Sequence, residues 1–524
     1  MKSKIKIGIL VDELKLQRWQ INALLELQQV ADFSALYIIL PKNSIAFSDS
    51  SPLLYRFYRN RFLRIKSQEK TDFPAFTANQ TVLRVNLFHS DKRNRLSEED
   101  LRRIKDLDLD VMIRFGMGIL DGEILQSSRL GIWSYHHGDP EFYRGGPPGF
   151  WEMKNNDPLT GFMVQQLTPQ LDMGKVLYKG YVKTTFHHYG EQWDNLLRAS
   201  EVGLKNAYLR SVDSKITLES PGRKGIFYSF PGTLPLISFL GNMWMSRIRL
   251  MVEKRFKREY WSIGFGKLDW QGVEPRIDEI HWLQSKDSDK YLADPFLFAG
   301  AKGLSVLAEE YSYRTRSAKI VAMDPATGST GTPTEILADR KHLSFPAVFT
   351  EDKRVILIAE SSGEHRVEAR IIHGLDEIAQ PVTLLEEPLF DTVMHRDGVY
   401  YWLLGSKKLG NTDALYLYFA NDWNGPYTAH PGNPVVQHPA YARNAGNLFM
   451  KNNRWIRPAQ NGVETYGAFV SFMEVIRLSP TEYEERHIQN LKPQRHWSHS
   501  EGLHTFNFLG DYAVIDAKKH VWKW

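Results

Sequence analysis

The stretch GIWSYHHGDPEFYRGGPPGFWEM, which runs from Gly131 to Met153, decides how the first half of the chain folds. An apolar strand leads into a loop with two adjacent histidines, an aspartate, an arginine and a double glycine, and a helix pattern follows. Upstream, the apolar runs KIKIGILV, FSALYIIL and LDVMIRFG alternate with amphipathic stretches such as SEEDLRRIKDLD. This alternation predicts a parallel sheet with helices on both faces, a Rossmann-like α/β fold. Ligands of such sheets bind beyond the carboxyl ends of the strands, so we expect chemistry in the loops after Phe115 and Tyr135.

Two further segments complete the pattern of the first half. RFGMGILDGEIL begins at Arg114, and TGFMVQQLTPQLDMGKVLYKG begins at Thr160. No G-x-G-x-x-G follows the first strand, so a dinucleotide site is not indicated. Together with the opening stretch, these segments resemble the formyltransferases that use formyltetrahydrofolate, including methionyl-tRNA and sugar-amine N-formyltransferases. The family pattern is a G-x-x-x-L turn, an N-x-H followed by an R-G loop, and L-D-x-G. It corresponds here to Gly116 to Leu120, Ser134 and His136 with Arg144 and Gly145, and Leu171 to Gly174.

The resemblance implies a site for formyl transfer to an amine. That reaction needs a base for the amine proton, donors for the oxyanion and a group that orients the base. The implied catalytic residues are His136 as the base, Asp172 as its carboxylate partner and Ser134 in the place of the family's asparagine. The residues implied to bind the cosubstrate formyltetrahydrofolate are Gly116, Met117, Gly118, Ile119, Leu120, Met173 and Gly174. Those implied to bind the acceptor substrate are His137, Asp139 and Arg144.

The sequence departs from the family pattern at Ser134 and in the HGDPE loop that replaces P-S-L-L-P. A hydroxyl reaches less far than a carboxamide, and loss of an oxyanion donor costs about 10²–10³ in rate. The site is therefore slower, rearranged with His137 or Asp139 filling in, or no longer a formyltransferase. Arg144 either holds a phosphate of a nucleotide-sugar or pins its loop, and a structural role is the commoner explanation for a histidine such as His137.

The second half, from about Glu274, is rich in strands and contains five similar segments. They recur at about fifty residues, a period that predicts a five-bladed β-propeller. The polar residues expected to converge on its central pocket are Asp294, Glu360, Asp391, Arg443, Arg457, Gln460 and His504. Through ADPF, SFP, AES and RPAQ, this half resembles the propeller-like domain of glucosamine inositolphosphorylceramide transferases and, less closely, five-bladed glycoside hydrolases. That resemblance implies work on carbohydrate, either binding or chemistry that uses two carboxyl groups.

The connector between the halves changes character along its length. Pro231, Gly232, Pro235 and Gly241 interrupt its uncharged part, which argues against a membrane-spanning helix. Residues 243–260 alternate apolar and basic side chains and predict a basic amphipathic helix, either packed between domains or in peripheral contact with an anionic membrane. The expected domains are residues 1–215 for the α/β fold, 216–262 for the linker and 263–524 for the propeller.

Composition limits the functional classes. The 524 residues have a net charge of only +5, from 66 basic and 61 acidic side chains, so no nucleic-acid partner is expected. With no cysteine, disulfides and thiolate metal sites are excluded, and no metal site is predicted. No secretory signal is recognised at the N-terminus, so a cytoplasmic protein is expected, with membrane association open.

We therefore predict formyl transfer from formyltetrahydrofolate to the amine of a nucleotide-linked or glycan-linked amino sugar, with the propeller binding carbohydrate. The first alternative is a carbohydrate-active enzyme whose site lies in the propeller and whose first domain has lapsed catalytically. The second is a glycan-binding protein without catalysis.

Overall fold

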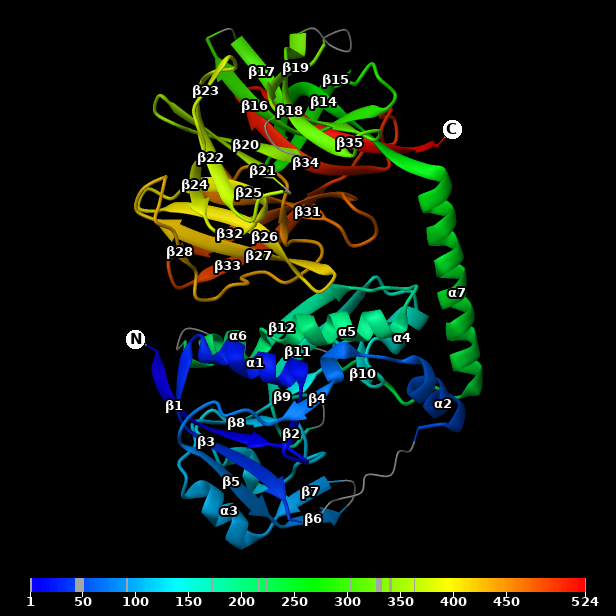
Figure 1. Cartoon of the computed structure of the whole chain (residues 1–524), viewed down its shortest axis with the longest axis vertical. Helices are drawn as coiled ribbons and strands as arrows, with labels where there is room; N and C mark the ends of the chain where they lie inside the picture. The colour runs from blue at the N-terminus through cyan, green and yellow to red at the C-terminus, as the bar shows by residue number, and fades with distance from the viewer. Residues whose placement is uncertain are drawn as a thin grey trace. The chain divides into compact units, whose positions relative to one another are not determined.

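The computed structural model describes residues 2–42, 51–90, 93–170, 173–213, 217–222, 224–301, 303–326, 332–338, 342–361 and 363–523. It divides into two compact units (Figure 1). The first contains Met1–Ile248 and Leu409–Thr412, and the second contains Arg249–Lys408 and Asp413–Trp524. Each unit has hydrophobic cores of its own.

A seven-stranded sheet in the order β12-β11-β9-β8-β1-β3-β5 forms the centre of the first unit. Its strands are β1 (Ser3–Leu10), β3 (Ala31–Pro41), β5 (Gln80–Val85), β8 (Val111–Arg114), β9 (Ile132–His136), β11 (Leu159–Gln166) and β12 (Lys175–Lys183). From β5 to β9 the neighbours are parallel, as predicted. The sheet is mixed at its other edge, where β11 runs antiparallel to both β9 and β12, so the expectation of a purely parallel sheet is corrected there.

Separate cores cover the two faces of this sheet. Leu24 and Leu27 of α1 and Leu204 of α6 pack into one core, while Ile104 of α3 packs into the other with Met117. The helices of this unit are α1 (Arg18–Gln28), α2 (Leu53–Phe62), α3 (Glu98–Lys105), α4 (Phe150–Lys154), α5 (Tyr189–Ser200) and α6 (Gly203–Val212). Short strands pair beside the sheet as β2 (Lys15–Gln17) with β4 (Lys70–Asp72), β6 (Leu87–Ser90) with β7 (Arg93–Leu96), and β10 (Tyr143–Gly145) with β13 (Ile226–Tyr228). Two 3₁₀ turns are Lys66–Gln68 and Glu123–Gln126.

The connector forms one long helix, α7 (Thr233–Phe256), which begins earlier than the predicted basic helix and ends before its last residues. Pro235 is accommodated because it lies in the first turn, where its missing N–H has no helical partner. Lys257 to Tyr260, predicted as helix, instead begin β14. In the described residues, no helix is long and apolar enough to cross a membrane.

Five sheets make up the second unit, in agreement with the predicted five-bladed propeller. Their inner strands are β16, β20, β25, β29 and β34, and each contacts the next around a closed ring either directly or, from β29 to β34, through β31. The first sheet in chain order contains β14 (Lys257–Gln271), β15 (Glu274–Leu283), β34 (Gly502–Leu509) and β35 (Tyr512–Trp522). The start and end of the propeller thus share one blade.

The other four blades are continuous in sequence. One contains β16 (Lys290–Gly300), β17 (Gly303–Ser312), β18 (Ser317–Met323) and β19 (Thr334–Leu337). The next contains β20 (Leu343–Glu351), β21 (Arg354–Ser361), β22 (Val367–Gly374), β23 (Glu377–Ile378) and β24 (Val382–Leu385). A third contains β25 (Phe390–Arg396), β26 (Tyr401–Leu409), β27 (Thr412–Ala420) and β28 (Thr428–Ala429). The last contains β29 (Arg443–Asn444), β30 (Phe449–Lys451), β31 (Arg454–Asn461), β32 (Phe469–Leu478) and β33 (Tyr483–Leu491).

Candidate functional site

Three polar side chains form a row at the carboxyl end of β8 and β9. Arg114, the last residue of β8, is in register with Ser134 of β9, and Ser134 is in register with Gln165 of β11. Residues that face one another across neighbouring strands project from the same face of a sheet. His136 lies two residues beyond Ser134 on β9 and so shares that face. The row therefore occupies the edge where parallel topology places a ligand.

The guanidinium of Arg114 is hydrogen-bonded to the hydroxyl of Ser134. Arg114 Nε and Nη2 donate to Ser134 Oγ at 3.1 and 2.7 Å, and Nη1 donates to the carbonyl of Gly118 at 2.5 Å. Ser134 Oγ in turn donates to the carbonyl of Tyr135 at 3.3 Å. The serine, predicted to stand for the family's oxyanion donor, thus has its hydroxyl engaged within the fold. The hydrogen-bond donors beside Ser134 belong to the guanidinium of Arg114. The sequence analysis gave Arg114 no role, and the pattern that could have identified it is a basic residue at the end of an apolar strand.

The turn after β8 is shaped by close backbone approach. A Cβ on Gly116 would lie 2.7 Å from the backbone nitrogen of Asp12, so only glycine fits there. Met117 has a positive φ of 64°, and its N–H donates to Asp12 Oδ1 at 2.7 Å. Met117 is one of the residues predicted to bind the cosubstrate. Because its side chain is buried in the core, only its backbone could contact that molecule.

Gly174, the last residue of the L-D-x-G segment, contacts the same row. The N–H of Gly174 donates to Gln165 Oε1 at 3.1 Å, and a Cβ on Gly174 would lie 2.3 Å from the carbonyl of Gln166. Gln165, which the sequence analysis did not single out, therefore ties this segment to Ser134. Asp172 lies outside the described residues, so its pairing with His136 stays a prediction.

A small pocket lies beside the row, with room for about 50 Å³. Its lining consists of Arg93, Arg114, Ile119, Leu120, Gln165, Leu167, Thr168, Pro169 and Gln170. Ile119 and Leu120, both predicted to bind the cosubstrate, are thus placed at the pocket together with Arg114. A water molecule occupies about 30 Å³ of liquid, so the pocket as it stands is smaller than a pterin.

The two adjacent histidines have different surroundings. His136 is half-buried, and its Nε2 lies 3.4 Å from the carbonyl of Tyr143. The ring of His137 is stacked on Tyr135 and meets Trp19 edge to face, and its Nε2 lies 3.1 Å from Ser200 Oγ. Burial lowers the pKa of His137 to about 3, so its ring stays neutral. His137 therefore belongs to the packing of the fold, in line with the structural alternative.

The other two predicted substrate residues are also engaged within the unit. Asp139 pairs with Lys179 at 2.8 Å and accepts from the hydroxyl of Tyr181 at 2.7 Å. Arg144 is buried, and its guanidinium lies 5.8 Å from the ring centre of Phe227. These contacts hold both side chains against neighbouring parts of the first unit, so they support the loop instead of pointing to a ligand.

A larger pocket, of about 390 Å³, lies near His136. Its wall includes Met163, which faces His136 across β11 and β9. Its charged lining residues are Glu141, Lys179, Arg210 and Glu219. Pockets of this volume accept small ligands, and groups of both signs suit a polar one.

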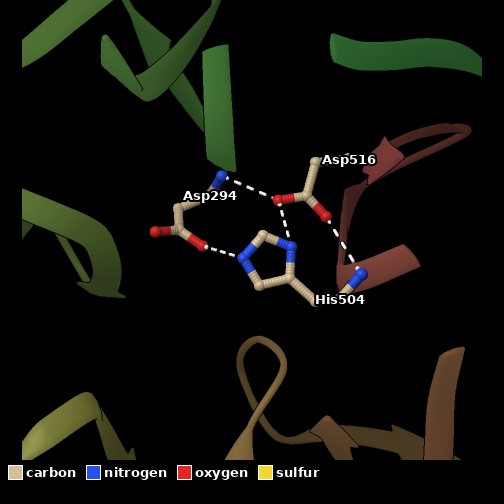
Figure 2. A group of neighbouring side chains, drawn as sticks. All are labelled: Asp294, His504 and Asp516. Atoms are coloured by element: carbon tan, nitrogen blue, oxygen red, sulfur yellow. Dashed lines mark hydrogen bonds and ion pairs between the residues drawn. The ribbon is translucent and has the colours of Figure 1, made fainter. Parts of the chain in front are cut away.

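At the propeller centre, His504 bridges two buried carboxylates (Figure 2). Its Nε2 lies 3.0 Å from Asp294 Oδ1, and its Nδ1 lies 2.8 Å from Asp516 Oδ2. Burial alone would lower the pKa of His504, but Asp516 and then Asp294 outweigh it and raise that pKa to about 10. Among the described residues, this group is the one whose ligand atoms lie close enough for a metal ion. A protonated imidazole has no free lone pair with which to bind a metal ion, so ion pairs hold these three side chains together instead.

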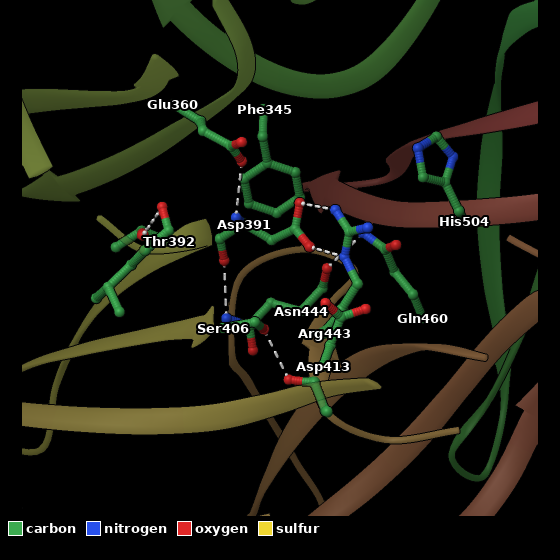
Figure 3. A network of polar contacts seen from close by, with 12 residues as sticks. Phe345, Glu360, Asp391, Thr392, Ser406, Asp413, Arg443, Asn444, Gln460 and His504 are labelled. Atoms are coloured by element: carbon green, nitrogen blue, oxygen red, sulfur yellow. Dashed lines mark hydrogen bonds and ion pairs between the residues drawn. The ribbon is translucent and has the colours of Figure 1, made fainter. Parts of the chain in front are cut away.

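A second buried cluster lies beside it (Figure 3). Arg443 Nε and Nη2 donate to Asp391 at 2.5 and 2.9 Å, and the N–H of Asp391 donates to Glu360 Oε2 at 3.1 Å. Burial, with the nearby charge of Asp391, raises the pKa of Glu360 to about 8. Burial also acts to raise the pKa of Asp294, but the cation of His504 outweighs it and holds that pKa below its usual value. A neutral and an ionised carboxyl group are therefore present at this centre.

Strained backbone turns three of the inner strands at the same place. Asp294, Phe345 and Asp391 have positive φ values of 52°, 47° and 48°, and the register of each strand is interrupted there. The N–H of each donates to a carboxylate of the preceding blade, namely Asp516, Asp294 and Glu360 respectively. These carboxylates therefore link blades, which is a structural reason for their presence besides any chemistry.

The two remaining residues predicted to line the propeller pocket have different surroundings. Gln460 donates from Nε2 to the carbonyl of Asn444 at 2.9 Å and lies in the polar network of Figure 3. Arg457 is fully buried and paired with Glu485 at 2.7 Å, so the structure places its charge within a blade and corrects its assignment to the pocket. Asp516 accepts from the backbone N–H groups of His504 and Thr505 and also pairs with the His504 ring.

Comparisons with known proteins agree with a two-part chain. The family described as "Glucosamine inositolphosphorylceramide transferase 1, N-terminal" matches residues 270–505. Glucosamine inositolphosphorylceramide transferase 1 of Oryza sativa subsp. japonica is 28% identical over 206 residues, which are 37% of this chain and 27% of the relative. Methionyl-tRNA formyltransferase of Synechococcus sp. (strain WH7803) is 33% identical over 95 residues, 17% of this chain and 28% of the relative. The chain thus spans little more than a quarter of these two relatives.

Solved structures show weaker likeness. A sugar N-formyltransferase from Shewanella sp FDAARGOS_354 has a TM-score of 0.29 and 14% identity, covering 45% of this chain and 86% of that one. A family 117 glycoside hydrolase from Zobellia galactanivorans has a TM-score of 0.31 and 11% identity, covering 45% and 77%. The sheet topology defines an α/β unit followed by a five-bladed propeller, and the sequence relatives of the chain include methionyl-tRNA formyltransferases. More particularly, its propeller is similar to the N-terminal domain of glucosamine inositolphosphorylceramide transferases.

Proposed function

We propose that the first unit transfers a formyl group from formyltetrahydrofolate to the amine of an amino sugar. The observation that carries this proposal is the row at the sheet edge. Arg114 provides a fixed cation there, bonded to and in register with Ser134, and Ser134 lies two residues before His136 on β9. The sequence relatives include methionyl-tRNA formyltransferases, which supports the reaction type. The family of the propeller suggests a sugar acceptor, because the name of that family includes glucosamine.

In this mechanism the cosubstrate supplies the formyl carbon, and the acceptor amine attacks it. The new amide bond forms as the amine adds to the formyl carbon, and His136 takes the proton that the amine loses. His136 then returns this proton to the folate nitrogen as the carbon–nitrogen bond to the folate breaks, so that tetrahydrofolate is released. Negative charge develops on the formyl oxygen, and the guanidinium of Arg114 stabilises it in place of a carboxamide donor. Ser134 holds Arg114 in position through two hydrogen bonds.

The cosubstrate would lie against Ile119 and Leu120, which line the small pocket beside Arg114. Thr168 to Gln170 line the same pocket, whose volume of about 50 Å³ is smaller than a pterin. The pocket of about 390 Å³ near Met163 is the natural place for the acceptor, because Arg210 and Glu219 in its wall can bind hydroxyl and amine groups.

The test incubates the full-length chain with formyltetrahydrofolate and a panel of aminosugar nucleotides, and mass spectrometry reads the products. We expect one sugar to gain the mass of a formyl group, and His136→Asn to abolish that gain. Asp294→Asn is the control, since it changes only the propeller. Absence of any formylated sugar, or equal activity of His136→Asn, would refute the proposal.

A second candidate is carbohydrate chemistry at the propeller centre. It is favoured by one observation, the neutral carboxyl of Glu360 near the ionised carboxylate of Asp294. A glycosidic bond is cleaved by such an acid and base pair. We expect any hydrolysis of aryl glucosaminides to decline as the pH rises through about 8, where Glu360 loses its proton, and to be lost in Glu360→Gln. Activity that persists in Glu360→Gln would exclude this candidate.

A further inference from the structure

The helix α7 has two apolar faces, and only one of them is packed in the first unit. Leu236, Phe239 and Met243 are buried in a cluster with Phe150 and Tyr189. A second apolar row lies on the other side of the helix at spacings of seven, four and three residues, which place its members on one face. This row contains Ile237, Trp244, Ile248 and Met251, with exposed fractions of 56%, 59%, 41% and 60%.

The helix α2 extends this exposed apolar face. Tyr55 of α2 is buried in the same cluster as Leu236, so the two helices pack together within the first unit. Phe230, just before α7, lies against Tyr55 with ring centres 5.6 Å apart. The side of α2 opposite Tyr55 is exposed and apolar, with Leu53 at 80% and Phe57 at 62%, and Phe62 at the end of the helix is 59% exposed. Large apolar side chains exposed in such density mark an interaction site.

Positive charge is concentrated in the same two helices and in the few residues that follow each of them. Residues 52–66 carry five Arg or Lys side chains and no acidic one, and residues 243–258 carry six and a single glutamate. Together these segments have a net charge of +10, so the remainder of the chain has a net charge of −5. Arg247, a basic residue of α7 within the first unit, acts electrostatically on Tyr58 of α2 and therefore lies near that helix. Basic side chains therefore flank the exposed apolar row.

We propose that this apolar–basic surface, formed by α2, residues 226–230 and α7, docks on an anionic lipid bilayer. Interfacial helices bury large apolar side chains at the level of the headgroups, while flanking Arg and Lys bind anionic lipids. Two copies of the chain would bring like charges together if they met through this face. A nucleic acid would use the arginines, but it would leave Leu53, Ile237 and Met251 unpartnered. The bilayer is the occupant that suits both features, and this inference does not rest on formyl transfer.

The test measures sedimentation of the full-length chain with vesicles of phosphatidylcholine alone or mixed with phosphatidylglycerol. We expect binding to the mixed vesicles, weaker binding at high salt, and little binding to phosphatidylcholine alone. The triple variant Phe57→Ser, Trp244→Ser, Ile248→Ser should lose at least about tenfold in vesicle affinity. The matched control is Val399→Ser, Ile476→Ser, Leu509→Ser, which changes comparably exposed side chains of the propeller.

A charge variant separates the two contributions. Arg61→Glu with Arg249→Glu should reduce binding to the anionic vesicles and weaken its salt dependence, since the net charge of the two segments falls from +10 to +6. Circular dichroism confirms that the variants fold. The same samples are examined by light scattering and by titration with tRNA. The proposal would be overturned by equal binding to neutral vesicles or by the absence of vesicle binding. It would also be overturned by a dimer that the triple variant breaks, or by tRNA binding that is lost in the charge variant while no vesicle binding is seen.

Discussion

Among single residues, Arg114 should matter most to formyl transfer after His136. Arg114→Met keeps the apolar stem and removes the guanidinium that donates to Ser134 and Gly118. We expect kcat to fall by about 10²–10³, with a smaller change in the KM of the acceptor, since the lost donor acts on charge that develops during reaction. Steady-state kinetics measure this. Arg129→Met, at an exposed arginine paired with Asp110, is the control and should keep full activity; a similar loss in both variants would point to misfolding instead.

His504 gives the propeller a pH dependence of known sign. Its pKa is raised to about 10 from 6.5, so between these pH values the folded chain keeps a proton that the unfolded chain has lost. The stabilisation from His504 is therefore complete below about pH 6.5 and is lost as the pH rises towards 10. Hydrogen exchange of peptides from β34 and β35 measures it. We expect the stability of His504→Gln to fall less steeply over this range than that of the wild type, while His487→Gln should follow the wild type.

Sequence reasoning located the residues of the sheet edge but not their pairings. His136, Gly116 and Gly174 were predicted from motifs, and the structure places them around the same edge. Arg114 and Gln165 were missed because their roles depend on the register of β8, β9 and β11, which no local pattern encodes. The types of the predicted site residues also did not show which of their side chains would be buried.

Two glycines test the elements that hold the first unit together. Gly241 lies within α7, and a Cβ there would meet no atom within 4 Å, so Gly241→Ala should stabilise the unit by about 0.5–1 kcal/mol. Gly145 has a φ of +83°, and its Cβ would lie 2.1 Å from the carbonyl of Tyr228, so Gly145→Ala should destabilise the pairing of β10 with β13 by more than about 1 kcal/mol. Urea denaturation measures both, and the same sign for the two variants would contradict this explanation.

Whole elements were easier to predict than their ends. The five repeated segments correspond to the inner strand pairs of five blades, because a strand, a turn and a strand recur in sequence. The start of α7 was missed because Pro235 resembles a breaker, yet the first turn of a helix tolerates it. The antiparallel edge of the α/β sheet was missed for another reason: β11 is buried on both sides, so its apolar run is like that of a parallel strand.

For the whole molecule, the decisive feature is how the propeller closes. β14 pairs with β35 from Lys257 with Trp522 to Lys267 with Tyr512, so the first and last strands hold the ring together. The family match of residues 270–505 leaves out most of β14 and all of β35. The sequence-based boundary at residue 263 would likewise remove the first six residues of β14, because local pattern cannot show a partner more than two hundred residues away.

A fragment of residues 257–524 is therefore expected to fold as a monomeric propeller, and one of residues 273–524 is not. Without β14, the edges of β15 and β35 lose their partner, and exposed strand edges promote aggregation. A fragment of residues 263–524 should fold with lower stability, since it loses the partners of Ala517 to Trp522. Size-exclusion chromatography, circular dichroism and thermal denaturation compare the three fragments. Equal stability of all three would mean that the ring is held by the contacts between blades and not by the pairing of its ends.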